Sequence, residues 1–129
     1  MSLPAISIAR ESTRVSATWV DVCALDDVPA GVGVAALVAG EAVALVKTRA
    51  GRLYAVSGYD PFSKAFVLAR GIVGDRAGVP KLTSPMYKQS FDLRTGVCLD
   101  EPGVRVAVYP VRVRDGRVLI RRALGGRAR

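Results

Sequence analysis

Short apolar segments separated by glycine-containing turns are the feature that most restricts how this chain can fold. Asp115-Gly116, for example, separates a segment in which valine and arginine alternate from a second apolar segment. This dipeptide favours a type I′ turn between two strands, because both central residues of that turn need a positive φ. The same pattern begins at Trp19 and predicts strands over residues 19–22, 32–38, 42–48, 53–57, 79–83, 90–93, 105–113 and 117–121.

Many short strands joined by frequent turns are typical of a small all-β protein. We expect an antiparallel β-sandwich or barrel in which the first four segments form one meander. Residues 58–90 do not alternate cleanly, and a short helical turn is expected over residues 65–69. The inward-facing residues are predicted to be Trp19, Val32, Ala44, Leu53, Val56, Phe91, Val106, Val111 and Leu119.

The chain shows no internal repeat and no boundary between folded domains. Residues 1–16 are polar without a sustained period, which predicts a flexible N-terminal extension. Residues 17–122 are predicted to form one β domain, and residues 123–129 a basic C-terminal tail.

The net charge of +8 is concentrated at one end of the chain. Residues 112–129 contain seven Arg and one Asp, which gives +6, whereas the first 111 residues hold 12 basic and 10 acidic residues and contribute +2. No interleaving of aromatic and basic residues typical of RNA-binding strands accompanies this excess, so no nucleic-acid partner is expected. The arginines are predicted to keep the tail soluble or to dock it on a partner.

Neither a membrane span nor a secretion signal is expected. The longest uncharged apolar run covers residues 28–40 and is interrupted by Pro29 and by glycines. A spanning helix needs about 20 apolar residues. The first residues lack a basic region followed by an apolar one, so the chain is predicted to be cytoplasmic.

The absence of histidine excludes most catalytic and metal-binding arrangements. Histidine-based triads, histidine proton transfer and mixed Cys–His metal sites all need an imidazole. The chain has two cysteines, Cys23 and Cys98, 75 positions apart, whereas a four-cysteine cluster needs four. They either remain thiols in a reducing cytosol or form a disulfide. No phosphate-binding glycine motif and no paired carboxylates for acid–base work are present, so no catalytic, cofactor-binding or metal-binding residue is expected.

Two segments are more specific. Residues 58–63 read GYDPFS, and residues 84–96 read SPMYKQSFDLRTG. Rieske ferredoxins carry similar boxes, C-P-H and C-P-x-H, with the second followed by an aromatic strand. Aligned in this way, Asp60 and Ser84 occupy the positions of the cysteine ligands, and Phe62 and Tyr87 occupy those of the histidine ligands. A Rieske centre needs two thiolates and two imidazoles, so these vestigial positions predict that no [2Fe–2S] cluster forms.

The pattern resembles the small-subunit family of NADH-dependent nitrite reductases, in which a Rieske-type fold lacks its cluster. The shared boxes are WVDVC at residues 19–23, YDPF at 59–62, LARGI at 68–72 and SPM at 84–86. The resemblance implies a non-catalytic subunit, inactive alone, that supports a large subunit during the reduction of nitrite to ammonium in nitrate assimilation. That large subunit is expected to hold FAD, an iron–sulfur cluster and sirohaem. The alternative is a cluster-free relative of Rieske ferredoxins that serves as a binding module for another oxidoreductase.

The two boxes also suggest a place for partner contact. In Rieske proteins the ligand loops form the tip that meets redox partners, so Phe62, Tyr87 and Lys88 are predicted to help dock the large subunit. The alternative is that Phe62 and Tyr87, together with Met86, fill the space that a cluster would occupy. Arg70 and Gly71 are predicted to form a turn in which glycine allows an unusual φ.

Overall fold

The computed structural model describes residues 19–121 of the 129-residue chain. The predicted extension over residues 1–16 and the predicted tail over residues 123–129 lie outside the described residues. The strands are β1 (Trp19–Ala24), β2 (Val32–Val38), β3 (Glu41–Lys47), β4 (Leu53–Ser57), β5 (Ile72–Arg76), β6 (Val79–Thr83), β7 (Ser90–Asp92), β8 (Val108–Tyr109), β9 (Val111–Arg114) and β10 (Arg117–Arg121). Short 3₁₀ helices, η1 (Leu25–Asp27) and η2 (Leu68–Arg70), interrupt them, and η2 overlaps the helical turn expected over residues 65–69.

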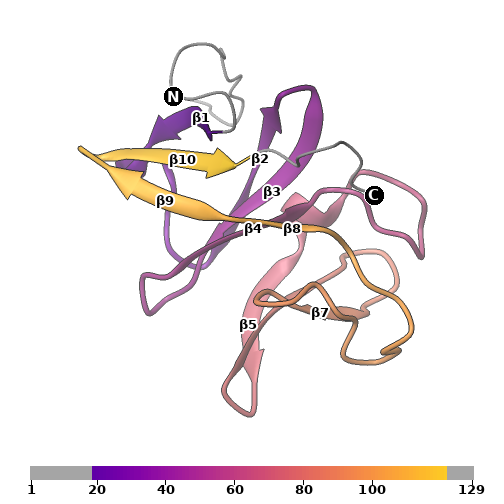
Figure 1. The fold of residues 1–129 in the computed structure, drawn as a ribbon. Coiled ribbons are helices and arrows are strands. Elements are labelled where there is room, and N and C mark those ends of the chain that lie inside the picture. The colour runs from indigo at the N-terminus through magenta and orange to yellow at the C-terminus, as the bar shows by residue number, and fades with distance from the viewer. Residues whose placement is uncertain (1–18, 122–129) are drawn as a thin grey trace.

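The strands form three antiparallel sheets, in the orders β1-β10-β9, β2-β3-β4-β8 and β5-β6-β7 (Figure 1). Three hairpins close through two-residue turns in which both residues have positive φ. Asp115 has a φ of 51° and Gly116 a φ of 77°, so the type I′ turn predicted at this dipeptide is confirmed. The three turn dipeptides are Ala39-Gly40, Ala77-Gly78 and Asp115-Gly116.

The β2-β3-β4-β8 sheet lies between two hydrophobic cores. Because successive side chains of a strand point to opposite faces, Val43 and Leu45 of β3 enter the first core, and Ala44 and Val46 enter the second. The first core, shared with the β1-β10-β9 sheet, contains Val22, Val28, Ala36, Val38, Val43, Leu45, Ala55, Tyr109, Val118 and Ile120. The second core, shared with η2 and the β5-β6-β7 sheet, contains Ala44, Val46, Val56, Leu68, Leu82, Phe91, Leu93, Cys98 and Val106.

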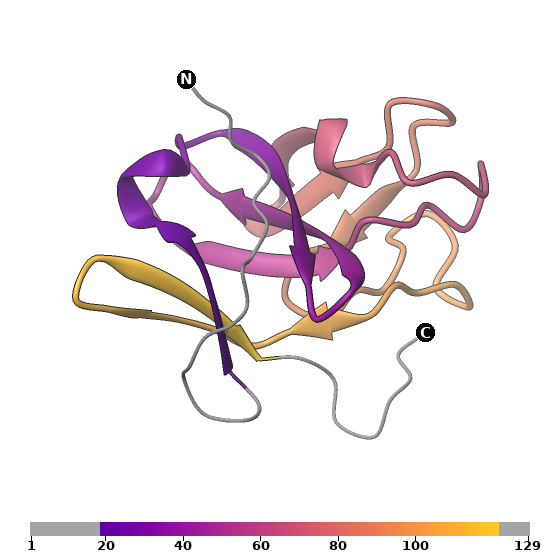
Figure 2. The same ribbon diagram turned by 90° about the horizontal axis from the view of Figure 1, so that it is seen from above.

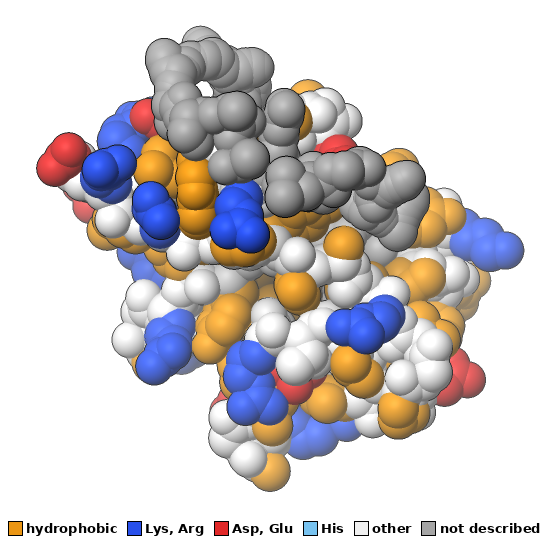
Figure 3. Space-filling model, in the orientation of Figure 1, with side chains coloured by type: hydrophobic (Ala, Val, Ile, Leu, Met, Phe, Trp, Pro, Cys, Tyr) orange, Lys and Arg blue, Asp and Glu red, His pale blue; other side chains and the backbone are white. Residues whose placement is uncertain are grey.

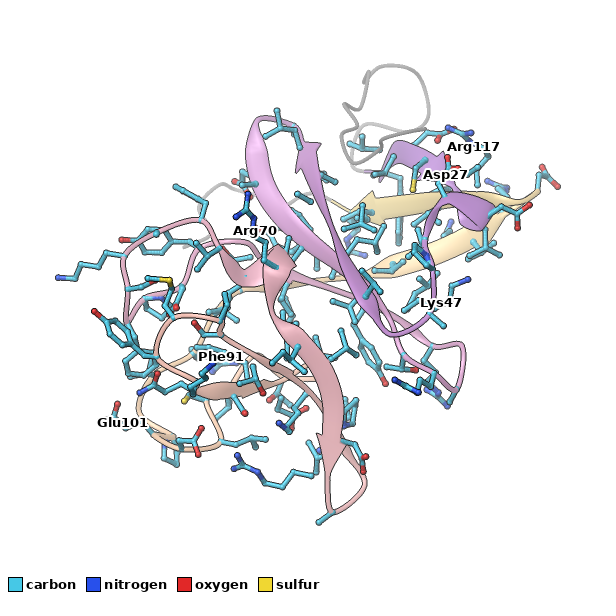
Figure 4. The ribbon with its side chains drawn as sticks, turned by 180° about the vertical axis from the view of Figure 1, so that it is seen from behind. Asp27, Lys47, Arg70, Phe91, Glu101 and Arg117 are labelled. Atoms are coloured by element: carbon cyan, nitrogen blue, oxygen red, sulfur yellow. The ribbon has the colours of Figure 1, made fainter. Side chains whose placement is uncertain are left out.

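The pictures show the same layering. In Figure 2 the β9–β10 hairpin and the β5-β6-β7 sheet lie on opposite sides of β2, β3 and β4. Figure 4 places Phe91 inside the part of the molecule built by β5, β6 and β7, whereas Glu101 lies at its periphery. The expected all-β antiparallel fold is confirmed.

One topological expectation is wrong. The first strand does not join the meander of β2, β3 and β4, because β1 pairs with β10 from the other end of the chain. Asp21 of β1 forms an ion pair with Arg117 of β10, at 2.8 Å between oxygen and nitrogen. The two paired strands lie at opposite ends of the described sequence, so the local pattern of β1 could not predict its partner.

Two strand boundaries also differ from those expected. The segment over residues 105–113 divides at Pro110 into β8 and β9, which belong to different sheets. Proline lacks the N–H that would continue the hydrogen-bond ladder, so it is suited to the point where a strand changes sheets. Strand β5 was not expected, because Gly71 and Gly74 interrupt the apolar pattern of its segment.

Most of the predicted inward-facing residues are buried, including Ala44, Val56 and Phe91. Trp19 is only half-buried, and 49% of Val32 is exposed. Val32 shares its side of β2 with the buried Ala36 and Val38 but lies at the beginning of the strand. Its orientation therefore follows the pattern, while its burial depends on how far the first core extends.

Candidate functional site

Two loops meet at one end of the molecule, on the side away from the β9–β10 hairpin (Figure 2). We call residues 58–67, between β4 and η2, the first tip loop, and residues 84–89, between β6 and β7, the second tip loop. The hydroxyl of Ser84 donates a hydrogen bond of 2.6 Å to Oδ2 of Asp60, and both residues are fully buried. The two sequence boxes therefore lie side by side, although 24 positions separate these residues.

The Asp60 carboxylate organises both loops. Its Oδ1 accepts a hydrogen bond of 2.9 Å from the backbone N–H of Phe62, and its Oδ2 accepts one of 3.0 Å from the hydroxyl of Ser63. In the other loop, the Ser84 hydroxyl oxygen accepts a bond of 3.1 Å from the backbone N–H of Met86. A buried carboxylate is costly unless it is hydrogen-bonded, and these contacts satisfy that requirement.

The two tip loops have the same local design. Each contains a polar residue followed by proline, and a lysine in the left-handed region stands four positions after the polar residue: Lys64 with a φ of 59° and Lys88 with a φ of 69°. The N–H of Lys64 bonds the carbonyl of Asp60, and the N–H of Lys88 bonds the carbonyl of Ser84. The repeated pattern, DPFSK at residues 60–64 and SPMYK at 84–88, is visible in the sequence and would have pointed to Lys64 as well as Lys88.

The predicted docking residues differ in their surroundings. Tyr87 is 59% exposed and Lys88 is exposed, whereas Phe62 is half-buried and packs on the second core. The Phe62 ring centre lies 6.1 Å from that of Phe91. Phe62 thus combines partial exposure with a packing role.

Sequence reasoning missed a second aromatic pair in the first tip loop. Phe66 is 68% exposed, and its ring centre lies 5.0 Å from that of Tyr59. These two rings, with Arg105 and the hydrogen-bonded pair of Tyr109 and Glu41, line a groove of about 590 Å³. Phe66 lies outside the boxes aligned with cluster ligands, and Tyr59 is not at a ligand position, so their spatial proximity reveals the pair.

Comparison with known proteins places the chain in a family. The model of the Rieske-like [2Fe-2S] domain family matches residues 18–121. The nitrite reductase (NADH) small subunit of Salmonella typhimurium is 38% identical over 104 residues, which cover 80% of this chain and 96% of that protein. The chain belongs to the nitrite reductase (NADH) small-subunit family.

Two further relatives place this small-subunit family member in context. A crystal structure described as an NADH-dependent nitrite reductase small subunit from Mycobacterium tuberculosis is 46% identical, with a TM-score of 0.79 and coverage of 82% of this chain and 96% of that one. The nitrite reductase [NAD(P)H] large subunit of Klebsiella oxytoca is 36% identical over 110 residues, which are 85% of this chain but 11% of that protein.

The residues of this small-subunit family member do not fit a [2Fe–2S] cluster. Asp60 and Ser84 bond each other directly, Phe62 has no donor atom, and Tyr87 offers a phenol in place of an imidazole nitrogen. Within residues 19–121 no three His, Cys, Asp or Glu side chains lie close enough together to hold a metal ion. The chemistry of this donor set suits a hydrogen-bonded loop structure.

Cys23 and Cys98 are both free thiols. Cys98 is buried in the second core, while Cys23 packs at the margin of the first. The middle sheet separates these cores, so the disulfide alternative is wrong. Burial raises the pKa of the Cys23 thiol to about 11, and the nearby Asp27 carboxylate acts in the same direction.

The turn expected at Arg70 and Gly71 is present, but for a different reason. Gly71 has a φ of −70°, which any residue adopts. A Cβ at this position would lie 2.5 Å from the carbonyl oxygen of Thr83, so the close approach of β6 requires glycine. Arg70 is exposed at the end of η2 (Figure 4).

Within residues 19–121 no helix has the length and apolar character that a membrane crossing demands.

Proposed function

We propose that this chain is the non-catalytic small subunit of a cytoplasmic NADH-dependent nitrite reductase, which reduces nitrite to ammonium in nitrate assimilation. The observation that carries the proposal is the end-to-end similarity to small subunits, since the match covers 96% of the Salmonella relative. The catalytic cofactors, FAD, an iron–sulfur cluster and sirohaem, belong to the large subunit in this proposal.

The Klebsiella large subunit supports the assignment of the partner. One part of that protein is similar to 85% of this chain, so the domain and a nitrite reductase large subunit occur there in one polypeptide. A domain that is covalently joined to its partner in one organism and separate in another is suited to stable contact in both.

The chemistry of the tip loops supports a role without a cluster. The Asp60–Ser84 hydrogen bond joins the two loops at the positions that align with the cysteine ligands. In this proposal the bond replaces the structural contribution of a cluster, and the chain transfers no electrons itself.

The tip loops also provide the proposed docking surface, formed by Phe62, Tyr87 and Lys88. Tyr87 and Lys88 are exposed on the second loop, and Met86 beside them is 55% exposed. Exposed aromatic and apolar side chains bordered by a cation are typical of the centre and rim of an interface.

Reconstitution with the purified large subunit tests the function. Alone, the chain is expected neither to oxidise NADH nor to reduce nitrite. Added to the large subunit, it is expected to increase the rate or the lifetime of nitrite-dependent NADH oxidation. If both the rate and the lifetime are the same without the chain, the proposed function is wrong.

The docking surface has a separate test. We expect Tyr87→Ala to weaken association with the large subunit by ~1–3 kcal/mol without changing the stability of the isolated subunit, because the side chain is exposed. Phe62→Ala is expected to lower both quantities, because the ring packs against Phe91. Val113→Ala, on exposed β9, is the control, and equal affinities for Tyr87→Ala and the control would place the interface elsewhere.

A further inference from the structure

Strand β2 forms one edge of the β2-β3-β4-β8 sheet, beside β3 and away from β4 (Figure 1). Its register with β3 runs from Val32 opposite Lys47 to Val38 opposite Glu41. In a hairpin closed by a two-residue turn, the residues that flank the turn exchange hydrogen bonds, and every second pair along the ladder does the same. Val38, Ala36, Val34 and Val32 therefore direct their backbone groups toward β3.

The alternate residues of β2 direct their backbone groups outward. A hydrogen bond on the far side of β3, from the N–H of Gly58 to the carbonyl of Ala42, confirms this alternation. Among residues 19–121, no hydrogen bond uses the outward N–H or C=O of Ala35 or Leu37. Ala35 is exposed, and Leu37 is 50% exposed.

The other edge strands of the described residues carry the features that prevent edge-to-edge pairing. Charged side chains, irregular register, proline and short length all discourage an additional strand. Asp21 and a register shift interrupt β1, Asp75 lies in β5, Asp92 ends the three-residue β7, Pro110 ends the two-residue β8, and Arg112 lies in β9. Strand β2 has seven residues, all Val, Gly, Ala or Leu, and none of these features.

We propose that the large subunit adds an extended segment to the outer edge of β2, so that the four-stranded sheet gains a fifth strand in the assembled enzyme. This inference rests on the proposed function for the identity of the partner. Unpaired N–H and C=O groups at alternate residues require a β-strand as occupant, because only a strand offers donors and acceptors at that spacing.

Neighbouring groups define the chemistry of the segment. Opposite Ala35 and Leu37 it carries uncharged side chains, since β2 has no charge to pair with one. At the beginning of β2, the Arg49 side chain lies beside Gly31, with Nε 3.7 Å from where a Cβ would be, and no ion pair occupies it in the described residues. The segment therefore carries a carboxylate at the end that lies beside Gly31.

A second copy of this chain is the competing occupant. The Klebsiella large subunit favours the partner, because a domain embedded in that polypeptide has the rest of the large subunit beside it. Pairing of two β2 edges would instead produce a dimer of the isolated subunit.

Amide hydrogen exchange of the full chain tests the inference directly. In the isolated subunit the amides of Ala35 and Leu37 are expected to exchange fast, while those of Val34, Ala36 and Val38 are protected by β3. Addition of the large subunit is expected to slow exchange at Ala35 and Leu37. Unchanged fast exchange at both amides in a complex that does form would overturn the edge pairing and leave the proposed function intact.

Two substitutions provide an independent readout. Ala35→Pro removes one outward N–H without touching the ladder to β3, and Leu37→Lys places a charge on the edge. Each is expected to weaken association with the large subunit about tenfold, comparable to the loss of one backbone hydrogen bond. The control, Val113→Lys, adds the same charge at a residue of similar exposure (45% against 50%) on β9 and is expected to bind as the wild type does.

The remaining outcomes are also decisive. Thermal unfolding of each variant shows whether the isolated fold is intact, and the exchange measurement on the wild type does not depend on any variant. A concentration-dependent dimer with slow exchange at Ala35 and Leu37 would assign the edge to a second copy and overturn the inference. If the wild-type chain does not bind the large subunit at all, the proposed function fails, and the inference fails with it.

Discussion

Asp60 and Ser84 lie in different tip loops, and their buried side chains meet through a hydrogen bond. The carboxylate accepts hydrogen bonds from the Ser84 and Ser63 hydroxyls and from the Phe62 backbone. The sequence boxes singled out both residues but gave no indication that their side chains bond each other. The contact across to the second tip loop depends on burial of both side chains.

The first prediction concerns this hydrogen bond. Ser84→Ala is expected to lower the free energy of unfolding by ~1–3 kcal/mol, because it removes the 2.6 Å bond to a buried carboxylate and leaves that oxygen less satisfied. Chemical denaturation of both proteins measures the difference. Ser63→Ala, which removes the longer 3.0 Å bond to the same oxygen at a partly buried site, serves as the control and is expected to cost less.

A second prediction at this scale concerns Cys23, whose thiol has a pKa raised by burial to about 11 from an ordinary value of 9.0. The folded state therefore favours the protonated thiol. Its contribution to stability is complete below about pH 9 and is lost as the pH rises through about 11. Alkylation of Cys23 at pH 8 is expected to be slower than that of a small free thiol and to accelerate toward pH 11.

Peptide mapping of the alkylated protein measures the rate at Cys23. Cys98 provides an internal comparison, because it is fully buried and should react only when the chain unfolds. Labelling of Cys23 at the rate of a free thiol at pH 8 would contradict the raised pKa.

At the scale of elements, close approaches between chain segments determine which glycines matter. Gly96 has a φ of 83°, and a Cβ there would overlap the carbonyl oxygen of Val106. Gly78 has a nearly identical φ of 86° but open space around it. The two positions share the same backbone conformation and differ in packing.

Gly96→Ala is therefore expected to destabilise the domain more than Gly78→Ala. Placing alanine in the left-handed region costs ~1–2 kcal/mol in both variants, and the overlap with Val106 adds a further cost only at residue 96. Thermal or denaturant unfolding of the two variants gives the difference. Equal losses of stability would show that the segment around Val106 moves away without cost.

Local sequence patterns predict the bounds of some strands and not of others. The bounds of β2, β4, β6 and β10 match the predicted segments. Strand β5 was not predicted, because Gly74 interrupts the apolar pattern of its segment. Its pairing with β6 stabilises it instead. Pro110 similarly divided a predicted continuous strand.

For the whole molecule, charge and aromatic side chains are combined on the β1-β10-β9 sheet. The Arg112 guanidinium lies 4.2 Å from the ring centre of Trp19, and Arg121 lies 5.9 Å from it. Figure 3 shows Lys and Arg side chains interleaved with hydrophobic ones over the β9–β10 hairpin. The arginines that the sequence concentrates in the last strands thus cover apolar surface as well as carrying charge.

The last prediction concerns the complete subunit. Because the four aligned positions hold Asp60, Phe62, Ser84 and Tyr87, the purified chain is expected to be colourless and to give no paramagnetic signal after reduction. Iron and acid-labile sulfide analysis measures the content directly. Stoichiometric iron with sulfide in the isolated chain would contradict the assignment.

The sequence by itself determined the fold class, the positions of most strands and the two tip-loop boxes, because these depend on local alternation, on turn residues and on motif order. The tertiary structure alone decided that β1 pairs with β10, that Asp60 bonds Ser84, and that β2 presents an unpaired edge. Each of these features joins or exposes segments distant in the chain. Their energies come from burial and from long-range pairing, which no short window of sequence contains.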